Sequence, residues 1–156
     1  MRELRLLIPD FNMEEFLQND ISSNLAPSVL GAYLKGDVEA LRKTCRDAAY
    51  GSLHKSCMER EAHQLVMEPR ILHISEPELE MVRFIGGFPT PVISFEAHQI
   101  NCVRNKLTRA VVEGSEDDIR AVHYLFALQI NESEDVPREE RWQVTELAVR
   151  GMQSVY

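Results

Sequence analysis

The chain has 156 residues, of which 44% are hydrophobic and 27% charged, and its formal net charge at pH 7 is −8. This length fits one domain with a sizeable core, and no apolar run approaches the roughly 20 residues that cross a bilayer. The negative charge argues against a nucleic-acid-binding protein, because neutralising phosphates requires a dominant basic surface.

The cysteine content and the start of the chain bear on the compartment. Cys45, Cys57 and Cys102 are sparse and odd in number, which fits a reducing compartment better than a disulfide scaffold. The start resembles a signal peptide only superficially, because its apolar core is short and Glu3 comes early. We expect that any presequence of the native protein has been removed from this chain.

The first sixty residues predict helices. Residues 1–11 are expected to form an N-terminal arm or the end of an amphipathic helix, and residues 12–156 a single domain. Asn12 is a suitable cap for the next helix, with Glu15 completing a capping box. Pro27 is expected to break or kink that helix.

Two further helices are predicted by their end signals. Gly36 is a natural end for the helix after Pro27, and Asp37 caps the helix that follows. A third stretch, from Ala48 to about Ala62, is helical in pattern although Gly51 interrupts it.

From residue 64 the hydrophobic period changes to two, which is typical of strands. Strands are predicted over residues 64–74, 79–85, 92–103, 109–113, 119–130 and 141–149. Pro69 places the first of them at a sheet edge or at a bulge. Residues 86–91 and 114–118 are predicted loops, so residues 92–130 would form a three-stranded antiparallel meander.

Helices followed by a curved antiparallel sheet predict an α+β fold in which the helices cover one sheet face. A strongly bent sheet around a helix is cone-shaped and leaves an apolar pocket, the usual place for a ligand. The residues expected to line it are Phe95, Val122, Tyr124, Phe126, Leu128 and Trp142.

Several short motifs occur together in one known family, in the same order and at about the same spacing. They are Pro9-Asp10-Phe11, Glu15-Phe16-Leu17, Val29-Leu30-Gly31-Ala32-Tyr33-Leu34-Lys35-Gly36-Asp37, Leu41, Arg70-Ile71-Leu72-His73-Ile74, Pro91-Val92-Ile93, Phe95-Glu96-Ala97, Val103-Arg104-Asn105, Val112-Glu113-Gly114 and Trp142. On these residues nearly the whole chain resembles the Tim44-like domain, the C-terminal domain of a peripheral subunit of the mitochondrial presequence translocase. Most of them are framework residues, so they identify the family better than a functional site.

The resemblance implies a cone similar to that of nuclear transport factor two, in agreement with the order of helices and strands. It implies a non-catalytic docking domain without a cofactor, peripheral to the mitochondrial inner membrane on its matrix side. The implied partners are translocase subunits, cardiolipin-containing membrane and a preprotein in transit. The matrix heat-shock chaperone is implied mainly through the family's upstream region.

Membrane contact would fall on the first segment, at Arg2, Leu4, Arg5, Leu6, Leu7 and Ile8. Basic and apolar side chains together suit an interfacial segment, and each basic residue near an anionic surface contributes about 1 kcal/mol. Two arginines give only weak binding, so the alternative is an ordinary helix end packed on the domain. The sequence leaves both interpretations open.

A second basic group, Arg104, Lys106 and Arg109, surrounds the predicted hairpin tip. Most such tips are simply solvated. This one is nevertheless a candidate for contact with anionic lipid or a partner.

Two alternatives to the docking function remain. Within the family, it is a mitochondrial ribosomal large-subunit protein that uses the same domain for membrane attachment, although a charge of −8 fits poorly with RNA. Outside it, Glu96 and His98, with His123 two strands along, suggest proton abstraction in a small isomerase-like enzyme. That enzyme requires these side chains at the pocket floor. A solvated pair is the simpler interpretation, so no catalytic residue is assigned.

A metal site is a weaker hypothesis. Cys45, His54, Cys57 and His63 include a permissive His-x-x-Cys spacing, but no paired Cys-x-x-Cys accompanies it. Scattered residues on helix faces are the better interpretation, so no metal is expected.

Overall fold

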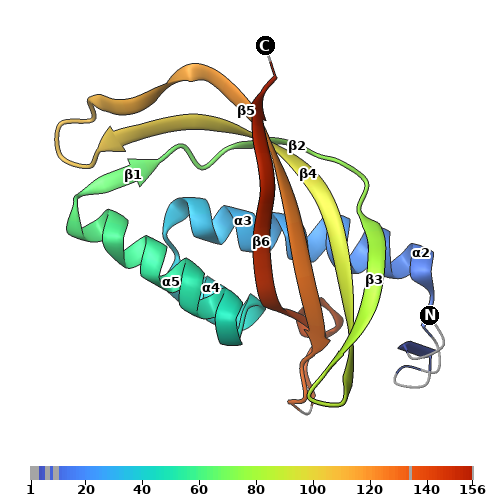
Figure 1. The fold of residues 1–156 in the computed structure, drawn as a ribbon. Coiled ribbons are helices and arrows are strands. Elements are labelled where there is room, and N and C mark those ends of the chain that lie inside the picture. The colour runs from blue at the N-terminus through green and yellow to red at the C-terminus, as the bar shows by residue number, and fades with distance from the viewer. Residues whose placement is uncertain (1–3, 6–7, 9–10, 134, 156) are drawn as a thin grey trace.

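A computed structural model describes residues 4–5, 8, 11–133 and 135–155 of the chain (Figure 1). Among these residues, helices come first and a six-stranded antiparallel sheet follows, which confirms the predicted α+β fold. The elements are α2 (Met13–Glu15), η1 (Phe16–Leu25), α3 (Ala26–Lys35), α4 (Val38–Thr44), α5 (Asp47–Ala62), β1 (Leu65–Met67), β2 (Ile71–Ile74), β3 (Glu78–Ile85), β4 (Phe88–Asn105), β5 (Val111–Ile130), η2 (Arg138–Glu140) and β6 (Trp142–Ser154).

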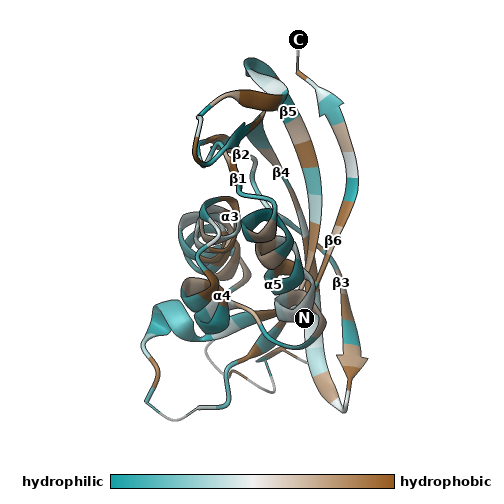
Figure 2. Ribbon diagram, turned by 90° about the vertical axis from the view of Figure 1, so that its left-hand side faces the viewer, coloured by the Kyte–Doolittle hydropathy of each residue, from teal (hydrophilic) through white to brown (hydrophobic). Residues whose placement is uncertain are grey.

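The sheet is organised around β4. Along one side β4 pairs with β1, β2 and β3, and along the other with β5, which in turn pairs with β6. Phe95 lies opposite Tyr124 and Ile93 opposite Phe126, and all four side chains point to the concave face. The helices lie on that side of the curved sheet (Figure 1), and Figure 2 shows the opposite side without a helix over it.

Helices and sheet share one hydrophobic core. Phe16 and Leu30 from the helical layer and Phe126 and Trp142 from the sheet are all at most 3% exposed. The ring centroids of Phe16 and Trp142 are 4.9 Å apart. Burying a side chain of this size contributes about 1.5–3 kcal/mol, so packing against the sheet stabilises the helical layer.

The first helical elements follow one another without a break. Asn12 caps them as predicted, because its side chain accepts a hydrogen bond from the Glu15 backbone N–H at 3.0 Å. The predicted break at Pro27 is wrong. The turns of η1 are π-helical, with the Ala26 N–H donating to the Ile21 carbonyl. Pro27 is the second residue of α3, and the backbone stays helical on both sides of the junction, with Leu25 and Ala26 in the right-handed helical conformation.

The predicted helix end at Gly36 and the predicted cap at Asp37 are confirmed, whereas the interruption at Gly51 is not. Gly36 ends α3 with a φ of 74°, a left-handed conformation that glycine adopts readily. The Asp37 side chain accepts a hydrogen bond from the Ala40 N–H at 3.1 Å and caps α4. Gly51 lies inside α5 without interrupting it.

The predicted loop at residues 114–118 is wrong, and the one predicted at residues 86–91 is shorter than expected, since only Gly86 and Gly87 form the turn between β3 and β4. Residues 114–118 do not divide two strands but belong to β5, which passes through a register irregularity with Gly114 at a φ of 69°. The turn-forming residues are accommodated as a bulge in β5, and the pairing between β4 and β5 continues on both sides of it. Pro89 and Pro91 belong to β4, where it pairs with β3 and has not yet reached the stretch paired with β5. The absence of an N–H at each proline therefore removes no hydrogen bond from the ladder between β4 and β5.

Candidate docking groove and the predicted sites

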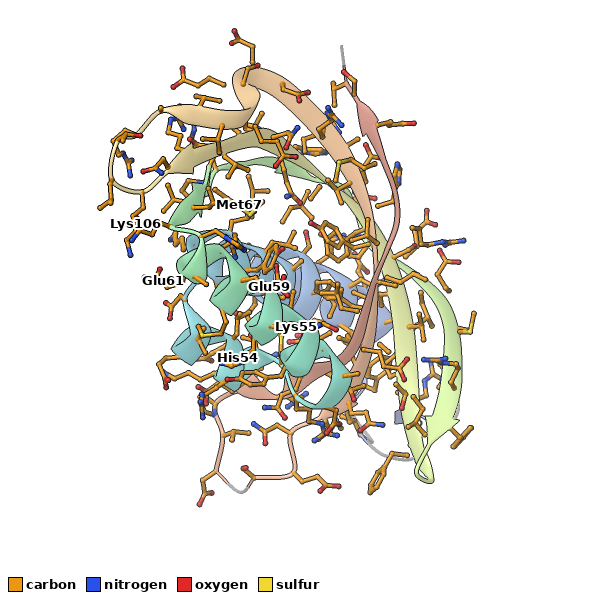
Figure 3. The ribbon with its side chains drawn as sticks, turned by 60° about the vertical axis from the view of Figure 1, so that its left-hand side comes forward. His54, Lys55, Glu59, Glu61, Met67 and Lys106 are labelled. Carbon is orange, nitrogen blue, oxygen red and sulfur yellow. The ribbon has the colours of Figure 1, made fainter. Side chains whose placement is uncertain are left out.

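A groove of about 550 Å³ lies at the open end of the cone. It is bounded by the end of α3, the second half of α5, β1 and the turn between β4 and β5. Figure 3 shows Lys106 from that turn beside Glu61 of α5, with Met67 of β1 next to them. Its apolar wall consists of Leu34, Met58, Leu65, Val66, Met67 and Pro69.

The rim of the groove is basic, although the whole chain is acidic. Four basic side chains and one acidic side chain line it, a formal charge of +3. They are Lys35, Arg60, Lys106, Arg109 and Glu61. A narrow apolar groove with such a rim can accept a ligand that combines an apolar chain with a negative charge.

At this rim, the Arg60 side chain connects α5 to the end of α3. Its guanidinium donates to the Leu34 carbonyl at 3.1 Å and to the Tyr33 carbonyl, both at the end of α3. The same guanidinium lies over the Tyr33 ring, 4.7 Å from its centroid. A cation at the carbonyl end of a helix is favourable, so Arg60 joins α5 to α3.

The predicted basic cluster at the hairpin tip is largely neutralised. Arg104 pairs with Glu116 and, at 3.8 Å, with Glu68. The Lys106 ammonium lies 3.0 Å from a Glu61 carboxylate oxygen. Among the described acidic residues none pairs with Arg109, which is exposed. The role of the cluster in lipid or partner contact stays a prediction, and it now depends chiefly on Arg109.

The predicted membrane segment is described only in part. Leu4 and Ile8 are buried in the hydrophobic core, so in this conformation their side chains are not available to lipid. Arg5 is exposed. The other three residues of the prediction, Arg2, Leu6 and Leu7, lie outside the described residues. The membrane role of the segment stays a prediction.

The side chains predicted to line an interior pocket are packed in the core. Phe95, Val122, Tyr124, Phe126, Leu128 and Trp142 are all at most 6% exposed. Among the described residues, the groove at the open end is lined by none of these six. The Tyr124 hydroxyl donates to the Gln99 side-chain carbonyl at 2.5 Å, and burial raises the pKa of Tyr124 well above its usual range. A ligand-binding role for the six stays a prediction.

The carboxylate and histidines of the isomerase-like alternative lie on the sheet face without helices. Glu96 is 2.9 Å from His98 and 3.7 Å from His123, and all three side chains are partly exposed. His123 is not two strands along but directly opposite Glu96, because residues 111–130 form one strand. These side chains therefore lie on the outer sheet face and not at the floor of the interior pocket where the enzyme alternative places them, and Glu96 and His123 instead line a hollow of about 390 Å³ on that face.

The arrangement of the described residues does not support the metal hypothesis. No group of three or more suitable ligands comes together among the described residues. Cys45 and Cys57 are buried free thiols, and the His54 ring stacks on Tyr50 with centroids 5.4 Å apart. Burial raises the pKa of the Cys45 thiol to about 11, which opposes the thiolate that a metal would need.

Sequence reasoning missed most of the groove. Its wall joins Met58 on α5 to Met67 on β1, and its rim adds Lys35 from the end of α3. Lys35 and the turn that holds Lys106 and Arg109 are distant in sequence from α5 and β1, and the segments carry no shared motif. The only signal was the basic hairpin tip, which supplies Lys106 and Arg109 to the rim.

Comparison with known protein families matches residues 1–149 to the Tim44-like domain. The chain belongs to this family. Similar proteins are the mitochondrial import inner membrane translocase subunits TIM44-1 of Arabidopsis thaliana (29% identical) and TIM44 of Homo sapiens (26%), each matched over 99% of this chain. TIM44 of Saccharomyces cerevisiae is 28% identical over 96% of the chain. The chain spans about a third of the length of these relatives, 32%, 34% and 35% respectively, and corresponds to their C-terminal domain.

A solved structure supports the fold of this Tim44-like domain. The intermembrane space region of the chloroplast protein ARC6 superposes with a TM-score of 0.57, covering 89% of this chain and 98% of that structure. At 14% sequence identity, this similarity shows the fold alone. Of the helices that the structure describes, none combines the length and apolar composition that a membrane-spanning segment requires.

Proposed function

We propose that this Tim44-like domain is a non-catalytic docking domain of the mitochondrial import translocase, peripheral to the inner membrane on its matrix side. The observation that carries the proposal is the family match over residues 1–149, shared with relatives that are inner-membrane translocase subunits. The partners are translocase subunits and a preprotein in transit. In the longer relatives, the other two-thirds of the chain would supply the link to the matrix heat-shock chaperone.

The groove and the N-terminal arm would supply the contact with cardiolipin-containing membrane. The groove combines an apolar wall with exposed basic groups at Lys35 and Arg109. Arg5 adds an exposed cation in the arm. Each such residue near an anionic surface contributes about 1 kcal/mol, so removing two cations should weaken binding about 25-fold.

Vesicle flotation with and without cardiolipin, at low and high salt, tests the membrane contact. Three variants each remove two positive charges: Arg2→Gln/Arg5→Gln in the arm, Lys35→Gln/Arg109→Asn at the groove, and Arg42→Gln/Lys43→Gln as the control. Arg42 and Lys43 are exposed on α4, outside the groove. We expect salt-sensitive binding that requires cardiolipin and weakens in the first two variants but not in the control.

Other outcomes would revise the proposal. Equal weakening in all three variants would mean that only net charge matters, and no groove or arm site exists. A wild-type domain that does not float would exclude membrane contact by this domain. Cross-linking in inner-membrane vesicles then decides the docking function, which fails if no translocase subunit is cross-linked.

A further inference from the structure

β6 is the last strand of the sheet, and the far edge of its second half is open. Within the sheet β6 pairs with β5 alone, and Figure 1 shows its whole length in front of the other elements. On the far side, the Arg46 N–H donates to the Val144 carbonyl at 2.9 Å, which joins the start of the strand to the helical layer. Between residues 146 and 153, none of the described residues forms a backbone hydrogen bond to this edge. An open strand edge is a template on which another strand can pair.

The hydrogen bonds at the two ends of the β5–β6 ladder show which residues face the open edge. The Asn131 N–H donates to the Arg141 carbonyl at 2.7 Å. At the other end, the Val155 N–H donates to the Ile119 carbonyl at 3.0 Å. Positions 120 to 130 of β5 are paired consecutively, so its odd-numbered residues bond to β6 and its even-numbered residues to β4. The β6 residues opposite even-numbered positions therefore direct their N–H and carbonyl groups to the open edge, and they include Leu147, Val149 and Met152.

The open edge has a short regular stretch with charged ends. Register irregularities at Thr145 and Arg150 bound residues 146–149 and limit how far another strand can pair. Glu146 and Ala148 are on the outer sheet face, and Arg150 lines the outer hollow that also contains Glu96. Leu147 and Val149 lie on the concave face, opposite Phe126 and Tyr124, and Val149 is 52% exposed.

We propose that this edge pairs with the same edge of a second copy of the chain, antiparallel about a twofold axis at Ala148. In this register Leu147 lies opposite Val149 of the second copy, and both direct their backbone groups toward each other, so each such pair exchanges two hydrogen bonds. The symmetry repeats the pair on the other side of the axis. The two six-stranded sheets would then form one continuous sheet, with both helical layers on the same side.

Charge complementarity selects the second copy and the register. Glu146 lies opposite Arg150 of the second copy, and the twofold axis makes this contact twice. Arg150 is exposed, and among the described acidic residues none pairs with it. Glu146 is 49% exposed and uses one carboxylate oxygen for Arg83 at 2.6 Å. A shift of the register by two residues in either direction breaks both charge pairs, so the edge is self-complementary only when Ala148 lies on the axis.

The association is expected to be weak. Five residues on each side bury less surface than the roughly 1,200 Å² at which stable interfaces begin. Each chain also carries a formal charge of −8, which repels a second copy, although at 0.15 M salt this repulsion is screened beyond about 8 Å. We expect a Kd of about 10⁻⁴–10⁻³ M. The contact does not depend on the membrane binding of the groove.

Disulfide trapping of the whole domain tests the register. In Ala148→Cys the two new thiols face each other across the axis, with Cα atoms about 4.5 Å apart, a separation that a disulfide can bridge. Gln153→Cys is the control, because it is exposed on the same strand but its two copies would lie about 33 Å apart. The three native cysteines are buried. Under mild oxidation at about 100 μM protein, we expect Ala148→Cys to form covalent dimers at least about tenfold faster than Gln153→Cys.

Charge reversal in the Ala148→Cys protein tests the two ion pairs. Glu146→Arg and Arg150→Glu should each slow dimer formation at least about fivefold, and the double variant Glu146→Arg/Arg150→Glu should restore it to within about twofold. Glu146→Arg reduces the net negative charge and should still slow the reaction, so general repulsion does not account for the pattern. Arg42→Glu, the same change as Arg150→Glu at an exposed position on α4, should have little effect. Circular dichroism verifies that each variant is folded.

Three results would overturn the proposal. Equal trapping of Ala148→Cys and Gln153→Cys would mean random collision rather than a paired edge. A folded double variant that is trapped as slowly as the single variants would refute the register. A dimer seen by sedimentation velocity that both single charge reversals leave intact would place the contact on another surface.

Discussion

Gly114 tests whether the bulge in β5 is a required feature of the fold. Its φ is 69°, and a Cβ added there would overlap the Asn101 backbone carbonyl and lie 2.7 Å from the carbonyl carbon. Substitution by alanine therefore imposes two costs at once, a left-handed backbone and a collision with the neighbouring strand. Gly36 has a similar φ of 74° but no atom within 4 Å of an added Cβ, so Gly36→Ala imposes only the first cost.

The two costs differ in size. The left-handed conformation costs an alanine about 1–2 kcal/mol, which is the expected effect of Gly36→Ala. The collision at Gly114 involves backbone rather than a flexible side chain, so β4 or β5 must move. Such overpacking costs about 1–3 kcal/mol more, and we expect Gly114→Ala to lower the free energy of unfolding by about 2–5 kcal/mol.

Urea unfolding followed by fluorescence measures both values. Trp142 is the single tryptophan and is buried in the core, so its emission reports on unfolding. Gly51→Ala is a control that should raise rather than lower the free energy of unfolding. Gly51 lies in α5, and no atom is within 4 Å of an added Cβ. The substitution should stabilise the protein by about 0.5–1 kcal/mol. A loss for Gly114→Ala no larger than that for Gly36→Ala would refute the collision.

Two further predictions concern buried titratable groups. Because burial raises the pKa of Tyr124, the folded chain keeps this proton above pH 10 while the unfolded chain releases it, so the free energy of unfolding should fall as the pH rises beyond about 10. An ultraviolet titration should show one of the four tyrosines ionising only on unfolding; four that ionise together in the folded protein would contradict this. Burial also raises the pKa of Cys45 to about 11, so iodoacetamide near pH 8 should alkylate Cys45 far more slowly in the native protein than in urea, as measured by mass spectrometry. Equal rates would contradict the burial of this thiol.

The fold class could be predicted from the sequence because it follows from the hydrophobic periodicity of each segment. The side chains of Val122, Tyr124, Phe126 and Leu128 alternate with outward residues, and all four are buried on the concave face as a period of two requires. The same reasoning failed at Gly114, where a bulge and a turn have the same composition. Counting one strand too many there also displaced His123 from its position opposite Glu96.

The surfaces were harder to predict than the core. The groove joins residues from α3, α5, β1 and the β4–β5 turn, and only the closed fold brings them together. The basic tip was recognisable, but its neutralisation was not, because Glu61 and Lys106 are 45 positions apart. Apolar residues on the outer face were invisible for a similar reason. Leu125 and Ala127 have the composition of strand residues, and only the position of the helices shows that they point away from the helical layer.

The attachment of β1, β2 and β3 to β4 has a consequence for motion. Each of the three short strands pairs with β4 and none pairs with another, so one can detach while its neighbours stay in place. The β4–β5–β6 core, with its long ladders, would remain closed during such an event. We therefore expect amide hydrogen exchange to be graded, fastest in β1, which has only three paired residues, and slowest at the centre of β4 and β5. Because β1 forms one wall of the groove, its detachment would widen the groove while the β4–β5–β6 ladders stay intact.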